Sequence, residues 1–507
     1  LCLAAGASAQ TYTVLHNFAG GPTDGSDPVG GVVSDGVRLY GVTDDGGVND
    51  KGILYSMNMD GSGYTVLHEF GNAAAAANPN SLPLLNGDIL YGTTYGGGAF
   101  GLGTIYRIKT DGTMYNSRPF NVPPDGARPV GPLAMSSDTV YGMCEEGGTF
   151  SDGAPLPHYF GTAFSIKTNG TGYTVFHNFA GSPSDGENPL AGFLLDGGML
   201  YGTTDEGGAY LSGDGTVFSL APDGSSQSIL HSFSFGDGAG ISSTLISDGS
   251  RLYGTTAVGG SATSLLFYGG GTVFAVDKDG SDFQTLYNLD FASGGMPGNV
   301  VQNGERLYGF AGHGGSGALF NGGVIFTLNI DGTGYTALRQ FDNLYSGTGA
   351  YPMGTPLLVN GTLYGITDAG GTGGEGVVFS YVIPTPPLMV TLSTIFPAAG
   401  SLWTIDVAVQ PLTQRFDAWA VIQGPDGTYH SMVLGQPGRL IPGAAPLARN
   451  VPGLPSAFTA QLLSMTLPTG LPAGAYTVIV ALLPAGSPPS LEAAIAGYGV
   501  QRIATIR

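Results

Sequence analysis

Charged residues are scarce in this chain, and the basic ones are scarcer still. Asp, Glu, Lys and Arg make up 10% of the 507 residues, against about 25% in a typical soluble domain. The 37 acidic and 16 basic residues give a net charge of −21. A surface of this sign repels phosphate backbones and anionic lipids, which argues against a nucleic-acid partner. It leaves neutral glycans, cell-surface or matrix proteins and divalent cations as the partners to consider.

Cysteines and long apolar runs are also nearly absent. Residues 1–10 read LCLAAGASAQ, which resembles the end of a secretory signal peptide with cleavage expected before Gln10. Cys2 lies in this remnant (residues 1–9), so the exported chain would keep Cys144 alone, as a packing residue without a disulfide. No later run of about 20 apolar residues predicts a transmembrane helix. We expect a secreted or cell-surface protein.

Familiar catalytic motifs are missing too. The sequence contains no P-loop, no Rossmann fingerprint, no His-Glu-x-x-His and no Gly-x-Ser-x-Gly. No stretch shows a convincing helical period, and we assign no catalytic residues. This argues against a nucleotide-using enzyme and predicts a chain built from strands.

What the chain has instead is one tripeptide, Leu-Tyr-Gly, that returns seven times. The copies end at Gly41, Gly92, Gly142 (with Val for Leu), Gly202, Gly254, Gly309 and Gly365, at spacings of 50 to 60 residues. A self-similar period of this size is typical of a repeat architecture. The 42% apolar content is ample for a buried core and argues against disorder.

Each repeat carries four strand signals. An apolar segment is followed by the Leu-Tyr-Gly strand, by a glycine-rich loop with a strand of the type Gly-Thr-Val-Phe, and by an Asp-Gly turn with a strand of the type Tyr-Thr-Val-Leu-His-Asn-Phe. The fourth-strand copies are predicted to begin at Tyr12, Tyr64, Met114, Tyr173, Gln227, Phe283 and Tyr335. Alternating polarity and Asp-Gly turns predict antiparallel strands, and four strands per repeat predict β-propeller blades.

The two ends of the array predict how it closes. The fourth-strand pattern occurs at 12–18 before any first strand, and the seventh repeat runs into Pro384–Pro387 without a fourth strand. We therefore predict an all-β, seven-bladed propeller over residues 10–383, in which the N-terminal strand completes blade seven and leaves no free edge.

The loop residues of the repeat resemble a known family. Residues 91–106 (YGTTYGGGAFGLGTIY) resemble the GloVer tandem repeat of bacterial secreted "choice-of-anchor" proteins. The resemblance covers about residues 11–383. The third, fifth and sixth copies depart from it at 143–146, at 261–268 and at 310–313. It implies export and surface association, and it implies no catalytic residues.

A second domain follows the repeats. After a Pro-rich linker at 384–388, residues 389–507 lack the repeat, and strands are predicted at 403–409, 416–422, 428–434, 459–467, 476–483 and 499–506. This number of strands in about 120 residues predicts an Ig-like β-sandwich. Such domains usually tether or assemble, so a homo-oligomer or filament is a further expectation.

Any site is expected on the face that carries the glycine-rich loops, because variable loops on a rigid scaffold commonly carry function. Its acidic residues are Asp44, Asp45, Asp50, Glu145, Glu146, Asp152, Asp205, Glu206, Asp214, Asp368 and Glu375. Of these, Asp205, Glu206 and Asp214 form the hypothetical metal site, with Ca²⁺ as the candidate ion and a plain solvated rim as the alternative. No other cofactor is expected.

Aromatic side chains in the two longest loops are the candidate ligand-binding residues. They are Phe150, His158, Tyr159, Phe160, Phe267 and Tyr268, which could stack on sugar rings or could bury one another. His158 and His313 are the loop histidines. His16, His68, His177 and His231 share one place in the fourth strand, which predicts a structural role, either along the exposed edge of the outer strand or in pairing with the neighbouring blade.

These observations favour a non-enzymatic binding or structural protein. The alternative is a carbohydrate-active enzyme, a hydrolase or a lyase, built on the same face. An enzyme would bring two carboxylates, or a His, a Tyr and an Arg, together in one pocket, whereas a binding protein or scaffold would show scattered acids and a shallow or blocked central channel.

Overall fold

The computed structural model is all β over the part of the chain that it describes. It describes residues 12–506 except for 72–74, 122–123, 152–158, 211–212, 262–268, 291, 316–321, 343–346, 384–387, 393–401, 410–415, 424–428, 433–439, 443–445, 452–457, 467–473 and 485–497. One short 3-10 turn, η1 (Gly21–Thr23), is the sole helical element among these residues. No described helix is long and apolar enough to cross a membrane. Two compact units result, Thr11–Val382 and one that contains Ile383–Arg507.

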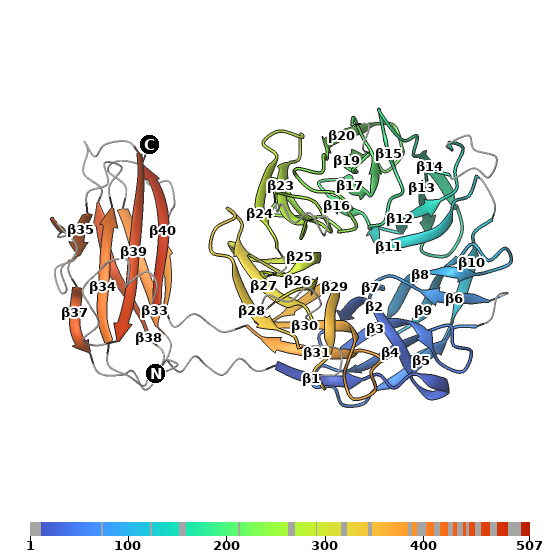
Figure 1. The fold of residues 1–507 in the computed structure, drawn as a ribbon, viewed down its shortest axis with the longest axis horizontal. Coiled ribbons are helices and arrows are strands. Elements are labelled where there is room, and N and C mark those ends of the chain that lie inside the picture. The colour runs from blue at the N-terminus through green and yellow to red at the C-terminus, as the bar shows by residue number, and fades with distance from the viewer. Residues whose placement is uncertain are drawn as a thin grey trace. The chain divides into compact units, whose positions relative to one another are not determined.

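The first unit consists of mostly antiparallel sheets arranged around a common centre (Figure 1), and the strands of the first and last repeats belong to one eight-stranded sheet. In the first repeat the order is β2 (Gly25–Ser34), β3 (Arg38–Gly46), β4 (Ile53–Asn58) and β5 (Thr65–Glu69). The next sheets hold β6 (Ala76–Pro79), β7 (Leu84–Asn86), β8 (Ile89–Gly97), β9 (Thr104–Lys109) and β10 (Asn116–Pro119); then β11 (Ala127–Ser136), β12 (Thr139–Glu146), β13 (Thr162–Lys167) and β14 (Thr174–Asn178).

The remaining repeats follow the same order. They hold β16 (Leu194–Asp196), β17 (Met199–Thr204), β19 (Thr216–Leu220) and β20 (Gln227–Ser232), with a separate pair β15 (Gly186–Glu187) and β18 (Glu206–Gly207); β21 (Ile246–Ser247), β22 (Arg251–Thr256), β23 (Thr272–Asp277) and β24 (Gln284–Asn288); β25 (Gly295–Asn303), β26 (Arg306–His313), β27 (Val324–Asn329) and β28 (Thr336–Gln340); and β29 (Ala350–Val359), β30 (Thr362–Ala369) and β31 (Val377–Val382).

The chain's first strand completes the last of these sheets. β1 (Tyr12–Asn17) runs antiparallel to β31, with Tyr12 opposite Tyr381 and Asn17 opposite Val377. This is the pairing that the sequence analysis predicts for residues 12–18. The first and last repeats also meet at their inner strands, where Gly31 of β2 pairs with Thr355 of β29. The two ends of the array are therefore held together at both edges of the sheet.

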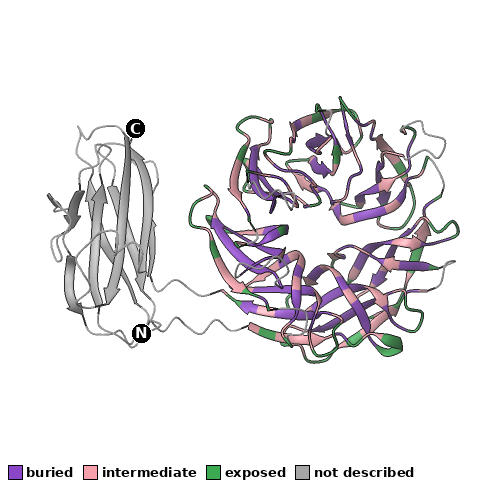
Figure 2. Ribbon diagram, viewed as in Figure 1, coloured by how far each residue is buried: buried purple, intermediate pink, exposed green. Residues whose placement is uncertain are grey.

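The Leu-Tyr-Gly motif has a direct packing explanation. Leu39, Leu90 and Leu200 are fully buried, and each following glycine lies under an aromatic ring of the third strand. A Cβ on Gly202 would stand 2.6 Å from Cζ of Phe218, which is closer than a carbon can approach. The middle strands therefore carry the core, as the buried residues in Figure 2 show.

A second glycine explains how neighbouring repeats join. Gly103, at the start of the third strand, has φ +90°, and a Cβ there would meet Cδ of Pro129 at 2.7 Å. Glycine alone combines this backbone with this contact at low cost. The proline of each following repeat takes the same place against Gly376, Gly52, Gly161, Gly271 and Gly323, and Ile241 does so against Gly215.

The outer strands are joined by stacked side chains. His16 stacks on Tyr64 with ring centroids 3.8 Å apart, and His231 stacks on Phe283 at 3.5 Å. The same place is filled by His68 on Tyr115, Arg118 on Tyr173, Tyr287 on Tyr335 and Arg339 on Tyr12. His16, His68 and His231 thus pair with the neighbouring repeat, which is one of the two roles expected of these histidines, while His177 contacts Asp185 and Phe179. In repeat two the stacking residue equivalent to Tyr64 is Tyr115. The start of the fourth-strand pattern predicted at Met114 is therefore wrong by one residue.

The second unit contains two sheets. One holds β32 (Leu388–Leu392), β33 (Leu402–Val409) and β38 (Phe458–Thr466). The other holds β34 (Phe416–Gln423), β35 (Tyr429–Met432), β36 (Leu440–Pro442), β37 (Pro446–Val451), β39 (Gly474–Pro484) and β40 (Tyr498–Ile506). All six strands predicted here are present, whereas β32, β36 and β37 were missed.

Candidate functional site

The glycine-rich loops and the crossings between repeats share one face of the first unit. Backbone hydrogen bonds join them: Asn78 N donates to Lys51 O at 3.0 Å, and Arg128 N donates to Leu102 O at 2.9 Å. The tight turns form a separate network, in which Met59 N donates to Val37 O at 3.3 Å. We call the first of these the loop-rich face, and it is the face on which the sequence analysis expects a site.

Two positions of each repeat build the inner rim of this face. The first is the residue that follows the second strand's Thr-Thr or its equivalent, such as Asp44, Tyr95 and Asp205. The second is the residue before the proline of the first strand, which has a left-handed backbone in Asp27, Asn78, Arg128, Asn188, Met296 and Tyr351, with φ between 51° and 60°. Because that backbone is unusual for Arg, Met and Tyr, it holds their side chains in a direction that a regular strand would not give.

Side chains at these positions meet across the junctions between repeats. The Arg128 guanidinium lies 5.2 Å from the Tyr95 ring centroid and donates to Glu146 Oε1 at 2.6 Å. Asn78 Nδ2 donates to Asp45 Oδ1 at 3.1 Å. The ring of Tyr351 lies 5.0 Å from that of His313. The rim therefore combines acids, aromatic rings, an amide and a guanidinium.

The rim acids of repeats one and seven are brought together around Asp27. Burial raises the pKa of Asp27, and the charges of Asp368, Glu375, Asp45 and Asp50 raise it further. Burial, with Asp45 and Asp27 nearby, raises the pKa of Asp44 to about 6. These partly buried carboxyl groups have few compensating cations, so protons bind them more readily than they bind ordinary carboxyl groups.

A second acidic group forms across repeats three and four. Burial raises the pKa of Asp205 to about 6, and the charges of Glu206 and Glu145 add to this effect. In repeat six, burial lowers the pKa of His313, and the nearby charge of Asp368 partly offsets this effect. Perturbed groups of this kind are enriched at functional sites, which makes the rim the leading candidate on this face.

The predicted metal residues lie near one another along the chain, yet they do not make a cluster. Glu206 is exposed, while Asp205 and Asp214 are half-buried. Among the described residues, no group of three or more His, Cys, Asp or Glu side chains is placed to hold a metal ion. The Ca²⁺ hypothesis stays a prediction.

The predicted aromatic residues divide between surface and core. Phe150 is 48% exposed, and Tyr159 pairs through its backbone with Ser151. Phe160 packs against the core between repeats three and four, so for this residue the self-burying interpretation fits better. His158, Asp152, Phe267 and Tyr268 lie outside the described residues. Cys144 is fully buried, as its expected packing role requires.

Sequence reasoning missed the residues before the prolines. The sequence does carry a signal for them. Six repeats have a proline at one place while the residue before it varies; these prolines are Pro28, Pro79, Pro129, Pro189, Pro297 and Pro352. A variable residue beside a recurrent proline indicates a fixed backbone that presents different side chains.

Comparison with known proteins gives one family. The model described as the Gloeobacter/Verrucomicrobia repeat matches residues 5–213, 155–267 and 211–396. No curated protein matches the chain. Similar solved structures include one of a protein assigned as TolB from Agrobacterium tumefaciens, with 11% identity, a TM-score of 0.34, and coverage of 64% of this chain and 94% of that one. A likeness at this level carries no argument about the fold or the function.

Proposed function

Because the chain belongs to the Gloeobacter/Verrucomicrobia repeat family, we propose that its first unit is a seven-bladed β-propeller that works as an exported, non-enzymatic binding module. Three sets of contacts support seven blades. The glycine–proline junctions pass from one repeat to the next and return to the first at Gly376 and Pro28. The outer stacks return at Arg339 and Tyr12, and the inner strands return at Gly31 and Thr355.

The ligand that the rim suits best is a neutral glycan. The observation that carries this proposal is the convergence, across junctions between repeats, of partly buried carboxyl groups with Tyr95, Arg128, His313 and Tyr351. Carboxylates accept hydrogen bonds from sugar hydroxyls, and aromatic faces pack on the apolar side of sugar rings. Holding Arg128 and Tyr351 in a left-handed backbone costs about 1–3 kcal/mol each, and such strain is concentrated at functional sites.

The second unit is proposed to be an Ig-like β-sandwich that tethers or assembles the protein at the cell surface or in the matrix. Its separation into two antiparallel sheets supports this. Export rests on the signal-like residues 1–9 and on the resemblance to secreted repeat proteins.

The test is a glycan array and a polysaccharide pull-down on the chain from Gln10, with and without Ca²⁺, followed by assay for released sugar. We expect binding without product. Binding that disappears on chelation would add a metal to the rim, while no binding in any condition would contradict the glycan proposal and favour a purely structural role.

Substitutions of single residues test whether the glycan binds at the rim. Asp44→Asn and Asp205→Asn should each weaken glycan binding, since an amide is a poorer acceptor than a carboxylate. Asp223→Asn is the matched control, because that exposed carboxylate accepts hydrogen bonds from Ser225 of its own turn, the one from Ser225 N at 2.9 Å. Affinity should rise between pH 5 and 7, as carboxyl groups with a pKa of about 6 ionise. Equal loss in the control would refute this placement.

A carbohydrate-active enzyme is the second candidate, and one observation favours it. A carboxyl group whose pKa is raised to about 6 by burial beside other carboxyl groups, as in Asp44, is the arrangement used by general acids of glycoside hydrolases. Release of oligosaccharide that Asp44→Asn abolishes would replace the binding proposal with this one.

A further inference from the structure

The outer strands of the repeats share a β-bulge. In repeat one, Val66 pairs with Tyr55 and His68 with Leu54, so Leu67 lies between them without a partner in the ladder. The same break in register occurs at Leu15, Phe176, Leu230, Leu286 and Leu338. Each bulge therefore presents one apolar residue toward the next repeat.

The bulge seals the junction with the next repeat. The glycine of the following tight turn packs on its main chain: a Cβ on Gly61 would lie 2.5 Å from Leu15 O, and one on Gly224 would lie 2.2 Å from Phe176 O. Gly112, Gly280 and Gly332 make the same approach to Leu67, Leu230 and Leu286.

The second repeat has lost the bulge residue. The segment from Tyr115 to Phe120, which contains β10, is one residue shorter than the segment from Tyr64 to Phe70. Ser117 pairs with Tyr106 and Arg118 with Ile105 without a break. The turn glycine of the third repeat, Gly170, accordingly has nothing within 4 Å of its Cβ position. This junction is left unsealed.

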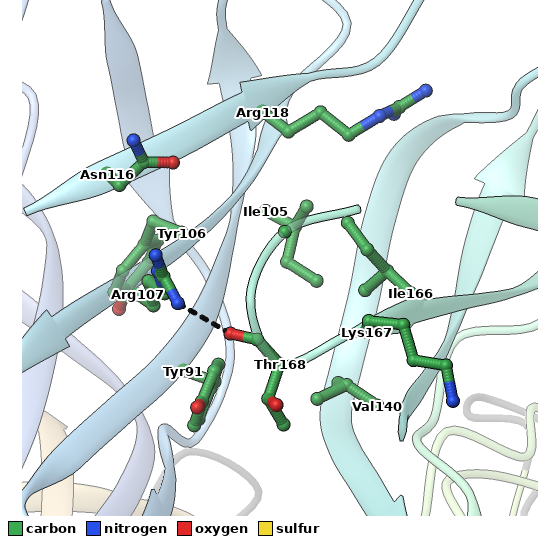
Figure 3. Close-up of a pocket in the computed structure, with 11 residues that line it drawn as sticks. Tyr91, Ile105, Tyr106, Arg107, Asn116, Arg118, Val140, Ile166, Lys167 and Thr168 are labelled. Carbon is green, nitrogen blue, oxygen red and sulfur yellow. Dashed lines mark hydrogen bonds between the residues drawn. The ribbon is translucent and has the colours of Figure 1, made fainter. Parts of the chain in front are cut away.

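A small pocket that is open to solvent, with a cavity volume of about 30 Å³, lies where the seal is missing. Ile105, Val140 and Ile166 give it an apolar wall, and the Tyr91 ring lies beside them (Figure 3). Arg107 lies between Tyr106 and Tyr91 at one side of the pocket, and its Nη1 donates to Thr168 O at 2.8 Å (Figure 3). The other repeats have a small residue at this place, namely Ser56, Ser165, Ser219, Ala275, Thr327 and Ser380.

Arg107 differs from the two other cations of this pocket. Lys167 Nζ lies 2.8 Å from Asp138 Oδ1, and an Arg118 nitrogen lies 2.8 Å from Asp125 Oδ2. Both of these charged ends point away from the middle of the pocket (Figure 3). Arg107 has no acidic partner among the described residues. Its remaining N–H groups are a planar fork of donors, which suits a carboxylate.

We propose that this junction is a binding site for a sugar acid, with the carboxylate on Arg107 and the ring against Ile105, Val140 and Ile166. The net charge of the chain, −21, repels anions. An anion would therefore bind here through the N–H groups of Arg107 and the apolar wall, and not through the overall charge of the protein. The site belongs to the side of the tight turns, at 167–170, and is separate from the rim on the loop-rich face.

Calorimetric titration of the full chain with sodium glucuronate, with glucose and with inorganic phosphate tests the proposal. We expect saturable binding of glucuronate, at least tenfold weaker binding of phosphate, which has no ring, and no binding of glucose. Phosphate binding as tight as glucuronate would overturn the sugar-acid assignment, and no binding of glucuronate would overturn the site.

Two variants and a control locate the binding. Arg107→Ser copies four other repeats, and insertion of Leu between Ser117 and Arg118 restores the bulge. Each should weaken glucuronate binding at least tenfold while the thermal midpoint stays near that of the wild type. Lys109→Ser removes an equal charge from the same strand outside the pocket and should leave binding unchanged. Glucuronate binding that survives both changes, or that falls equally in the control, would refute the assignment.

Discussion

His68 should make the first unit less stable as the pH falls. Its ring stacks on Tyr115 with centroids 3.9 Å apart, and burial lowers its pKa from 6.5 to about 4. His16, His177 and His231 each have an Asp within 3.1 Å, whereas His68 has no ion pair among the residues that the structure describes. Because the unfolded chain takes up a proton near pH 6.5 and the folded chain does not, the stability is intact above that pH. It is lost progressively between pH 6.5 and 4.

The magnitude follows from the shift. A change from 6.5 to about 4 corresponds to an upper limit of about 3 kcal/mol, at about 1.4 kcal/mol per pH unit. His68 is only partly buried, so solvent screening reduces this to about 1–2 kcal/mol. Carboxyl groups with raised pKa, such as Asp44, act in the opposite direction, because the folded state then binds protons more tightly. The contribution of His68 must therefore be measured as a difference from a variant.

Urea denaturation of the wild type and of His68→Tyr between pH 7.5 and 4.5 is the assay. Tyrosine keeps the stack, as Tyr287 does on Tyr335, and removes the titration. Both tryptophans, Trp403 and Trp419, lie in the second unit together with three of the 25 tyrosines, so near-ultraviolet circular dichroism of tyrosine reports mainly on the first unit. The wild type should lose about 1–2 kcal/mol relative to the variant over this range. Tyr287→Phe should match the wild-type slope. Parallel curves for the wild type and His68→Tyr would refute the reasoning.

Three further predictions concern the packing of the repeats. Tyr55 Oη is buried without a hydrogen-bond partner, and Phe holds this place in five repeats, so Tyr55→Phe should raise the free energy of unfolding by about 1 kcal/mol; a lower urea midpoint would contradict this. Gly202→Ala places a Cβ 2.6 Å from Phe218 Cζ and should cost about 1–3 kcal/mol, and an unchanged thermal midpoint would show that the ring can move. Deleting residues 12–18 exposes the edge of β31 and should cause concentration-dependent association in light scattering; a stable monomer would count against this closure.

Much of the fold could be predicted because the strand and turn signals of each repeat lie in residues that are close together in the sequence. The alternation around Leu200–Thr204 and the Asp-Gly turns identify strands without any knowledge of distant residues. The pairing of β1 with β31 followed from counting strands at both ends of the array. The N-terminal halves of the first strands of the repeats, such as β2 and β11, were missed. Asp27 and Arg128 in these strands precede prolines, and this context is typical of turns. The one-residue shift at Met114 came from an alignment that did not recognise a deleted bulge.

The sequence by itself determined the number of repeats, the four-strand order and the places of glycine and proline, since these depend on backbone geometry within a few residues. The tertiary structure alone decided which side chains meet. Asp27 and Asp368 become neighbours because the last repeat returns to the first, and the pocket at Arg107 opens because one turn finds no bulge to pack on. Both depend on contacts between residues that are distant in the chain, and one repeat read by itself does not contain them.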